Sequence, residues 1–278
     1  MATLDTGTSD LLARTEGNVA VISFNRPQAR NALSDAMYDG FARVLPQIAS
    51  NHDIRVVMVT GEGGAFCAGG DVKGMNARHR DADGGAASRG NSTETAVTHL
   101  RRIQAQVSTS LRRLPQPVVA SLPGAAAGAG LSIALAADLR IAAERAIIVT
   151  AFANVGASGD FGTSFFLTRI VGEAKAKELM FTSPRLSARE AKEYHMVNAV
   201  LPDEGYEEAA LNWCHDLATR APIALQYMKA NVNRAFDVGL EAALDAEAAG
   251  MVRTMATADH REAAAAFVEK RQPRFSGN

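Results

Sequence analysis

The sequence has little of what marks secreted, metal-binding or nucleic-acid-binding proteins. Its two cysteines, Cys67 and Cys214, form neither a metal-binding spacing nor a disulfide framework, so we expect a reducing cytoplasm. The net charge is −1, which gives no general electrostatic reason to bind nucleic acid. No apolar run approaches the roughly 18 residues needed to span a bilayer. Residues 1–10 are polar and lack the pattern of a signal peptide.

What the chain does have is enough apolar sequence for a large core, since 47% of its 278 residues are hydrophobic. Helix caps are predicted at Ser34 and at Ser187, which forms a capping box with Glu190, and Pro46 is expected to kink or shorten its helix. Apolar runs predict strands over 19–24, 54–60, 117–122, 139–142, 146–150 and 197–201. Apolar periodicity and caps predict helices over 35–48, 93–113, 163–171, 173–181, 204–219, 223–238, 240–256 and 259–270. Strands thus crowd the first two thirds of the chain, and helices fill the last third.

The chain is organised around a glycine-rich turn over 61–73, with the sequence G-E-G-G-A-F-C-A-G-G-D-V-K. It follows the buried strand over 54–60. Backbone N–H groups at a strand–turn–helix junction lack internal partners and point outward, which suits a negative charge that develops on an oxygen. The alternative is an ordinary glycine-rich surface turn.

A second set of free backbone donors is expected from residues 125–137, which are nearly all small. A helix with such side chains can pack close to another backbone or to a ligand, and its N-terminal N–H groups face whatever lies in front of it. Between these two segments, residues 76–92 are polar, glycine-rich and without periodicity. They predict a mobile loop, which is either a lid over the same site or a plain surface insertion.

Four short motifs resemble those of the crotonase superfamily, which contains enoyl-CoA hydratases and isomerases. They are N-R-P at 25–27 with R-N-A-L at 30–33, A-F-C-A-G-G-D-V-K at 65–73, P-V-V-A at 117–120 through G-A-G at 128–130 and A-D at 137–138, and A-F-V-E-K-R at 266–271. The resemblance runs in register from about residue 11 to 275.

The resemblance implies an α/β fold: a spiral of ββα units in two sheets over residues 1–200, followed by a helical trimerisation region over 201–278. It also implies an acyl-CoA thioester as substrate and a homotrimer or dimer of trimers as the assembly. No metal and no cofactor are implied, because coenzyme A is part of the substrate.

In this family two backbone N–H groups bind the thioester oxygen, and by position they belong here to Gly70 and Ala129. Each well-placed donor is worth roughly 3–4 kcal/mol in such chemistry. Contacts to coenzyme A are implied for Arg30, Ala32, Gly70, Asp71, Val72, Lys73, Ala129, Phe267 and Lys270, the last two often from a neighbouring subunit. The further arginines at 101, 102, 112 and 113 are interpreted as a solvated helix face.

The chain departs from the hydratases at their two catalytic glutamates, which correspond to Ser132 and Phe152. We expect Ser132 to face a neighbouring helix and Phe152 to line a pocket. The remaining carboxylate is Asp160, in a loop where some branches place a single catalytic aspartate. The dehalogenase branch adds a histidine on an earlier helix, but Ala105 occupies that position and His99 is interpreted as a surface residue.

Asp160 either acts as a proton-transferring group or is a solvated or capping residue before the helix at 163. Beside Phe152 and Phe161 it would be partly desolvated and suited to act as a base. One such group can carry a proton between two carbons, so double-bond migration is the preferred activity. The alternatives are an enoyl-CoA hydratase, a hydrolase or dehalogenase with Asp160 as nucleophile, and a non-catalytic acyl-CoA binding protein.

Overall fold

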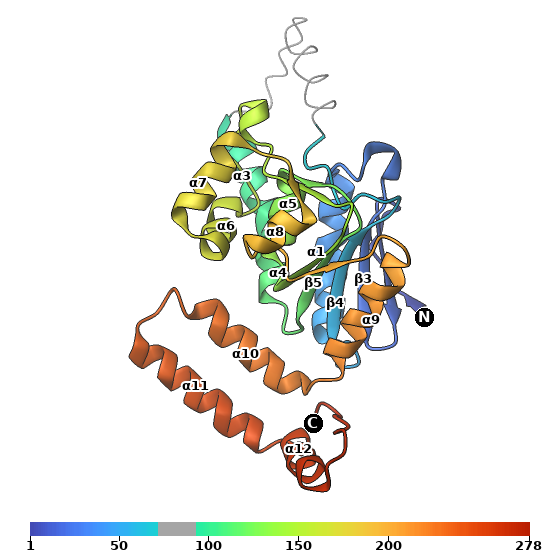
Figure 1. Ribbon diagram of the computed structural model, residues 1–278, viewed down its shortest axis with the longest axis vertical. Coiled ribbons are helices and arrows are strands. Elements are labelled where there is room, and N and C mark those ends of the chain that lie inside the picture. The colour runs from blue at the N-terminus through green and yellow to red at the C-terminus, as the bar shows by residue number, and fades with distance from the viewer. Residues whose placement is uncertain (72–92) are drawn as a thin grey trace, which may run out of the picture.

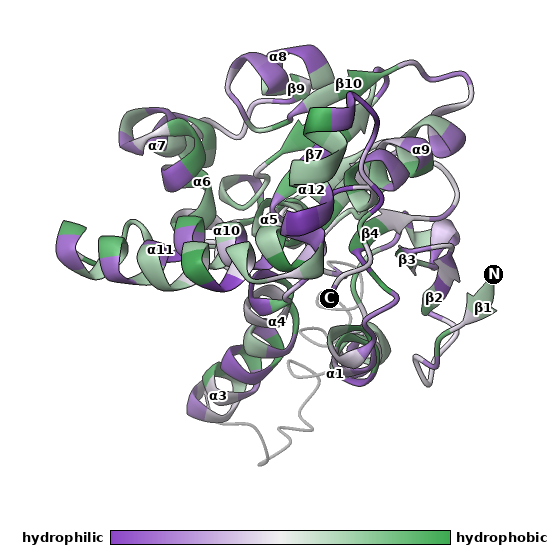
Figure 2. Cartoon of the chain, turned by 90° about the horizontal axis from the view of Figure 1, so that it is seen from below, coloured by the Kyte–Doolittle hydropathy of each residue, from purple (hydrophilic) through white to green (hydrophobic). Residues whose placement is uncertain are grey.

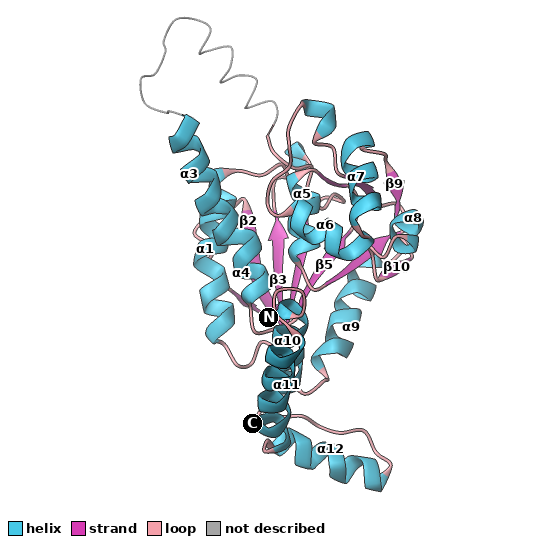
Figure 3. Cartoon of the chain, turned by 90° about the vertical axis from the view of Figure 1, so that its left-hand side faces the viewer, coloured by secondary structure: helices cyan, strands magenta, loops and turns pink. Residues whose placement is uncertain are grey.

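The computed structural model describes residues 1–71 and 93–278, and within these ranges it contains two β-sheets (Figures 1 and 3). The larger sheet has the order β1-β2-β3-β4-β5-β7-β10 and is parallel from β3 onward. Its strands are β1 (Ala2–Thr3), β2 (Leu11–Glu16), β3 (Val19–Phe24), β4 (Val56–Gly61), β5 (Val118–Leu122), β7 (Leu139–Ala143) and β10 (Ala199–Leu201). The smaller sheet consists of β6 (Ala126–Ala127), β8 (Ile147–Val149) and β9 (Leu186–Ser187).

Helices cover both faces of the large sheet and make up the C-terminal part of the chain. Before the last strand they are η1 (Pro27–Ala29), α1 (Asp35–Ser50), α3 (Thr93–Gln104), η2 (Ala105–Thr109), α4 (Ser110–Arg113), α5 (Ala129–Ala136), η3 (Ala153–Val155), α6 (Thr163–Val171), α7 (Glu173–Thr182) and α8 (Ala188–Glu193). After it come α9 (Tyr206–Ala218), α10 (Pro222–Arg234), α11 (Leu240–Met255) and α12 (Ala258–Glu269). The predicted strands and helices are thereby confirmed in kind and order, with the two corrections given below.

Alternate residues of the central strands enter two cores, as expected for a sheet that is buried on both faces. On β3, Ala20, Ile22 and Phe24 belong to the larger core with α1, α4 and α5. Val19 and Val21 face the other side, where they pack with residues of α9. In Figure 2 the surrounding helices show both green and purple residues, which is the pattern of amphipathic elements.

Helix α1 begins as predicted and ends later than predicted. The Ser34 side chain caps it by accepting a hydrogen bond from the Met37 N–H. Pro46 does not shorten the helix, which continues to Ser50. Since Ile48 is fully buried in the larger core, tertiary packing holds the last turn in helical form despite the missing proline N–H.

The small-residue segment was predicted to be helical from residue 125, and this is wrong for its first residues. Ala126 and Ala127 instead pair with Ile148 and Val149 in the smaller sheet, so α5 begins only at Ala129. The correction matters because it places the first free N–H of the helix at Ala129.

The helices after β10 differ in how they contact the sheet. α9 packs on it through Tyr206, Ala210 and Cys214, whereas α10 has no buried residue. α10, α11 and α12 extend away from the sheets (Figure 1). The division of the chain at residue 200 stays a prediction. Among the described helices, none has the length and apolar character that crossing a membrane requires.

Candidate active site

The glycine-rich turn after β4 and the start of α5 are joined by backbone hydrogen bonds. The N–H groups of Phe66 and Cys67 donate to the Ala125 carbonyl, at 3.0 and 3.1 Å. In return, the Ala127 N–H donates to the Cys67 carbonyl at 3.0 Å. Two segments about sixty residues apart in the sequence therefore form one rigid backbone unit.

Two glycines permit this close approach. A Cβ on Gly130 would lie 2.4 Å from the Cys67 carbonyl oxygen. Gly69 has a φ of +91°, and a Cβ there would lie 2.8 Å from the Ala127 oxygen and 3.4 Å from the Ala129 nitrogen. The backbone just before Gly70 thus lies directly beside the first residue of α5.

The amide groups of Gly70 and Ala129 are the donors that the family resemblance implies for the thioester oxygen. Within residues 1–71 and 93–278, neither N–H donates to a protein acceptor. Ala129 is the first residue of α5 and is 4% exposed, so its free N–H is at a buried helix N-terminus. The structure brings the two residues together, and their joint binding of one oxygen stays a prediction.

Asp160 is partly buried, and aromatic residues lie close to the loop that carries it. Phe161 is fully buried, and the ring of Phe152 lies between the start of α5 and the Asp160 loop, 3.9 Å from a Cβ built on Gly128 and 3.8 Å from one built on Gly159. The Asp160 Oδ1 atom is buried and has no hydrogen-bond partner in the described part of the chain. Burial raises the pKa of Asp160 to about 6.

The alternative role of Asp160 as a helix cap is wrong. The N-cap of α6 is Gly162, which makes no side-chain cap hydrogen bond. It is the backbone carbonyl of Asp160, and not its carboxylate, that accepts from the N–H and hydroxyl of Thr163, at 3.1 and 2.9 Å. The carboxylate is therefore left without a structural task that these contacts explain.

The loop that carries Asp160 is held from the helical segment α3–η2. The Phe161 N–H donates to Gln104 Oε1, and the Ser108 hydroxyl donates to the Phe161 carbonyl, both at 2.8 Å. Phe161 itself has a φ of +49°, which is strained for a non-glycine residue and is held by these two bonds. Gln104 directly precedes the π-helical turn η2 and Ser108 lies within it, as is common for such turns at functional sites. Sequence analysis missed both residues.

Of the two residues at the positions of the hydratase glutamates, Ser132 faces a neighbouring helix as predicted, whereas the role of Phe152 as a pocket wall stays a prediction. The Ser132 hydroxyl faces α6, where it is hydrogen-bonded to the Thr163 hydroxyl, and it also donates to the Gly128 carbonyl at 3.1 Å. Phe152 is 8% exposed. Ser132 therefore links α5 to the helix that follows the Asp160 loop, and neither residue supplies a carboxylate.

Tyr38 of α1 is a further residue near Asp160 that sequence analysis missed. Its ring stacks on Phe161, with 5.7 Å between the ring centroids and an interplanar angle of 23°. Its only sequence signal was a place one residue after the buried Met37, which does not distinguish it from any other side chain near the core.

No histidine stands where the dehalogenase branch needs one. Ala105 is an exposed residue at the start of η2. His99 is half-exposed and lies 4.0 Å from the exposed carboxylate of Asp35, which confirms its interpretation as a surface residue.

The implied coenzyme A contacts near the turn are brought together in part. The Arg30 carbonyl accepts from the Ala68 N–H at 3.0 Å, and the buried Ala32 is followed by Leu33, which pairs with Gly70. Asp71 lies 3.6 Å from the Arg26 guanidinium. Val72, Lys73 and the predicted lid over 76–92 lie outside the described residues.

Phe267 and Lys270 lie elsewhere in this chain. Phe267 is 86% exposed on α12, and Lys270 follows the end of that helix. α12 is at the opposite end of the molecule from the turn that leads into residue 72 (Figures 1 and 3). Within a single chain the structure does not bring them to the glycine-rich turn.

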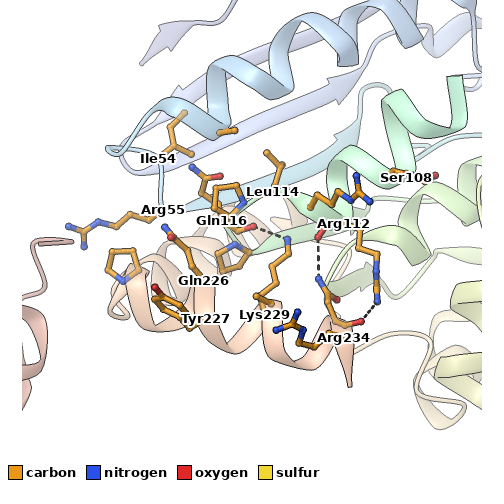
Figure 4. A pocket seen from close by; sticks show the side chains of 18 of the residues that line it. Ile54, Arg55, Ser108, Arg112, Leu114, Gln116, Gln226, Tyr227, Lys229 and Arg234 are labelled. Carbon is orange, nitrogen blue, oxygen red and sulfur yellow. Dashed lines mark hydrogen bonds between the residues drawn. The ribbon is translucent and has the colours of Figure 1, made fainter. Parts of the chain in front are cut away.

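A cleft of about 1290 Å³ lies between α10 and the core (Figure 4). Its lining includes Phe161 and Gly162, which directly follow Asp160. Lys229 of α10 crosses the cleft to pair with Asp138 at 2.7 Å and to donate to the Gln116 carbonyl at 3.0 Å. Arg112, interpreted from the sequence as solvated, is instead half-buried: it lies over the ring of Phe165 and donates to the Asn233 carbonyl at 2.7 Å. Arg112 is half-buried because its guanidinium group packs against the aromatic residues of α6. Arg101, Arg102 and Arg113 are exposed as predicted.

Comparison with known proteins gives one consistent result. The family model described as enoyl-CoA hydratase/isomerase matches residues 14–278. A protein of Escherichia coli named 1,2-epoxyphenylacetyl-CoA isomerase is 35% identical over 267 residues, which are 96% of this chain and 98% of that protein.

Solved structures agree with these sequence matches. The crystal structure of an enoyl-CoA hydratase from a Polaromonas species has a TM-score of 0.86 and 33% identity, and it covers 96% of this chain and 99% of that one. An enoyl-CoA hydratase from Bacillus anthracis has a TM-score of 0.84 and 32% identity, with 97% and 100% covered. The predicted crotonase fold is confirmed, and the chain belongs to the enoyl-CoA hydratase/isomerase family of the crotonase superfamily.

Proposed function

We propose that this acyl-CoA enzyme is an enoyl-CoA isomerase in which Asp160 moves a proton between two carbons of the acyl group. The observation that carries the proposal is the Asp160 carboxylate, which is partly buried, has one oxygen without a hydrogen-bond partner among the described residues, and has its pKa raised to about 6. A carboxylate with such a pKa is ionised at neutral pH and still basic enough to take a proton.

In the proposed reaction the thioester oxygen accepts hydrogen bonds from the N–H groups of Gly70 and Ala129. Asp160 takes a proton from a carbon next to the double bond, and the electron pair of the broken C–H bond delocalises onto the thioester oxygen. The two amides stabilise this dienolate. Asp160 then returns the proton to the other end of the conjugated system, which moves the double bond and regenerates the carboxylate.

Hydration is the second candidate, because the solved relatives from Polaromonas and Bacillus anthracis are named enoyl-CoA hydratases. A hydratase needs groups that hold water and protonate carbon together. Here the Ser132 hydroxyl is already bonded to Gly128 and Thr163, and Phe152 has no polar group. The name of the Escherichia coli relative, an acyl-CoA isomerase, favours isomerisation.

For coenzyme A we propose the surface formed by the backbone at Arg30, Ala32 and Asp71. Contacts from Val72 and Lys73, which lie outside the described residues, stay predictions from the sequence. Phe267 and Lys270 would complete this surface from a neighbouring subunit of a homotrimer or dimer of trimers. The mechanism needs no cofactor beyond the coenzyme A of the substrate. This point and the cytoplasmic location stay predictions from the sequence.

The test is to replace Asp160 by Asn and to measure turnover of 3-enoyl-CoA thioesters together with the Kd for coenzyme A. General acid–base catalysis contributes about 10²–10⁴-fold, so we expect a loss of that size in kcat with the Kd nearly unchanged. Asp53→Asn changes an exposed aspartate and is the control.

A D160N variant with wild-type turnover would refute the role of Asp160. A trapped acyl-aspartate in mass spectrometry would favour nucleophilic attack by Asp160, and intact binding in a wild-type protein without turnover would favour a non-catalytic acyl-CoA binding protein.

A further inference from the structure

The loop that follows β3 runs beside the glycine-rich turn and is hydrogen-bonded to its end. β3 and β4 are parallel neighbours, so this loop and the turn leave the sheet at the same end (Figure 1). The Leu33 N–H donates to the Gly69 carbonyl at 2.9 Å, and Leu33 pairs with Gly70 in an isolated parallel bridge. The Ala68 N–H donates to the Arg30 carbonyl at 3.0 Å. The loop thus contacts the backbone that leads directly into the Gly70 amide.

The bond from Leu33 determines the direction of the Gly70 N–H. The Gly69 carbonyl and the Gly70 N–H belong to one peptide group, and in a trans peptide these two groups point in opposite directions. Because the carbonyl points to Leu33, the N–H points away from it. This peptide lies between two glycines, which resist its rotation less than any other residues would. Its orientation therefore depends on the partner that the Gly69 carbonyl finds outside the turn.

The loop is in turn held by the buried side chain of Asn31. Asn31 Nδ2 donates to the carbonyls of Glu62 and Ala65, at 2.9 and 2.8 Å, and Oδ1 accepts from the Arg26 N–H at 2.8 Å. The side chain is fully buried, and both of its donors are used. Gly61 leaves room for it, since a Cβ there would lie 2.7 Å from Nδ2. Asn31 therefore joins the loop to the first half of the glycine-rich turn.

The position of Asn31 requires both its backbone conformation and its two donors. Its φ is +57°, in the left-handed region that asparagine and aspartate adopt more readily than other residues with a side chain. An aspartate there would have no donor for the two carbonyls. Leu33 is only two residues further along the chain, so a displacement of Asn31 also moves the Leu33 N–H. The Arg26 guanidinium supports the residue between them by donating to the Ala32 carbonyl at 2.8 Å.

We propose that Asn31 is the positioning residue of the Gly70 donor. Its side-chain amide holds the loop, the loop holds the Leu33 N–H, and the Leu33 N–H directs the peptide between Gly69 and Gly70 so that its N–H points at the thioester oxygen. The proposal rests on the proposed function, because it assumes that Gly70 binds this oxygen. Such a donor stabilises the transition state only when it is held in place before the reaction.

The test measures the carbonyl stretching frequency of bound butanoyl-CoA, labelled with ¹³C at the thioester carbonyl, by infrared difference spectroscopy. Hydrogen bonds to a carbonyl oxygen lower this frequency, and the saturated ligand has no double bond to move. The proteins are the wild type, Asn31→Gly and Asn31→Asp. Glycine tolerates the left-handed conformation, and aspartate keeps the acceptor for the Arg26 N–H, so both variants lose the two donors without backbone strain.

We expect the bound carbonyl frequency in both Asn31 variants to move from the wild-type value towards that of the free ligand. Their kcat for 3-enoyl-CoA at saturation should fall about 100-fold, the effect of a misplacement of about 1 Å. Asn18→Gly is the matched control. Asn18 Nδ2 also joins two loops, by donating to the Asp53 carbonyl at 2.8 Å, but at the opposite end of β3 and β4. Its variant should keep the wild-type frequency and kcat.

Two results would overturn the proposal. One is a wild-type frequency and kcat in the Asn31 variants, with circular dichroism showing that they are folded. The other is a weaker Kd for coenzyme A at unchanged frequency and kcat, which would mean that Asn31 supports only the coenzyme A surface. D160N should keep the wild-type frequency, so a failure of Asn31 is distinct from a failure of Asp160 as the base. A wild-type frequency equal to that of the free ligand would refute the donors at Gly70 and Ala129 themselves, and the positioning role with them.

Discussion

Asp160 is a partly buried carboxyl group, and its Oδ1 atom is shielded from water and has no hydrogen-bond partner among the described residues. Burial alone accounts for the raised pKa of about 6, since no charged residue contributes to the shift. Burying this carboxyl lowers the free energy of unfolding, and favourable packing elsewhere in the fold compensates for the loss. Such unfavourable burial is common at catalytic sites. The aromatic residues near the loop of this carboxyl are Tyr38, Phe152 and Phe161.

The pH dependence of the activity follows from this pKa. Asp160 must be ionised to take a proton, so kcat/KM should be constant above pH 7, half-maximal near pH 6, and about tenfold lower at pH 5. A carboxyl with the ordinary pKa near 4 would keep almost full activity at pH 5. The measurement is kcat/KM between pH 4.5 and 8 at constant ionic strength. A midpoint at pH 4, or one above pH 7, would contradict the assignment of Asp160 as the base.

For single residues, the sequence was informative only at positions that the family resemblance or the local residue types define. The partial desolvation of Asp160 could be predicted from the nearby Phe152 and Phe161, and the contact of Ser132 with a neighbouring helix from its place among small residues. Tyr38 and Gln104 could not be predicted, because their contacts to Phe161 depend on tertiary structure, and Gln104 is 57 positions away. The strained φ of Phe161 has no sequence signal either, since a phenylalanine seldom adopts it.

Among the elements, the α3–η2 helix acts as the support of the Asp160 loop. Replacing Gln104 by Leu removes the acceptor for the Phe161 N–H, and the loop then loses one of its two anchors. We expect kcat to fall about tenfold, the effect of one lost and unsatisfied hydrogen bond on a positioned base, with the Kd for coenzyme A unchanged.

The matched control is Gln106→Leu, in the same segment. Gln106 Oε1 is buried and has no partner among the described residues, so its removal should leave turnover intact. If Q104L and Q106L behave alike, or if Q104L changes the Kd more than kcat, Gln104 does not position the loop.

The glycine-rich turn gives a second prediction for an element. Gly69 and Gly64 both have positive φ, of +91° and +79°, so alanine at either position costs about 1–2 kcal/mol of backbone strain. Only at Gly69 would the new Cβ also meet backbone, 2.8 Å from the Ala127 oxygen, whereas nothing lies within 4 Å at Gly64.

We therefore expect Gly69→Ala to lower turnover by more than about 100-fold, because it displaces the Gly70 amide, in line with the loss of one oxyanion donor. Gly64→Ala should lose stability in urea unfolding but keep turnover within about threefold. Equal turnover in the two variants would show that the approach of the turn to Ala129 is unimportant.

The elements themselves were largely predictable from apolar periodicity and caps, as at Ser34 and at Ser187 with Glu190. Two features were not. The start of α5 at Ala129 depends on the pairing of Ala126 with Ile148, which no local pattern indicates. The continuation of α1 past Pro46 depends on the burial of Ile48, so packing outweighed the local preference.

For the whole molecule, the C-terminal helices leave apolar side chains uncovered. Met228 and Val232 on α10, Phe236 two residues after its end, and Leu244 and Val252 on α11 are all more than half exposed. Exposed apolar side chains that gather in a patch are typical of interfaces between chains. This exposure agrees with the proposed trimer, in which Phe267 and Lys270 would reach a neighbour's coenzyme A site.

The prediction is a mass in light scattering of three or six times that of one chain. Val232→Glu combined with Val252→Glu should shift it to one chain and weaken coenzyme A binding, because buried carboxylates cannot be accommodated in an apolar interface. Glu247→Gln on α11 is the control with an exposed polar residue. A single-chain mass for the wild type would contradict the assembly.

The central claim is that Asp160 alone carries the proton between two carbons of an enoyl thioester. The most direct measurement is the incorporation of deuterium at C2 and C4 of a panel of enoyl-CoA thioesters in D₂O, followed by mass spectrometry and NMR for the wild type and D160N. The account predicts exchange at both carbons with the wild type and a loss of about 10²–10⁴-fold at both with D160N. Exchange at C2 and C4 that continues at the wild-type rate in D160N would contradict it.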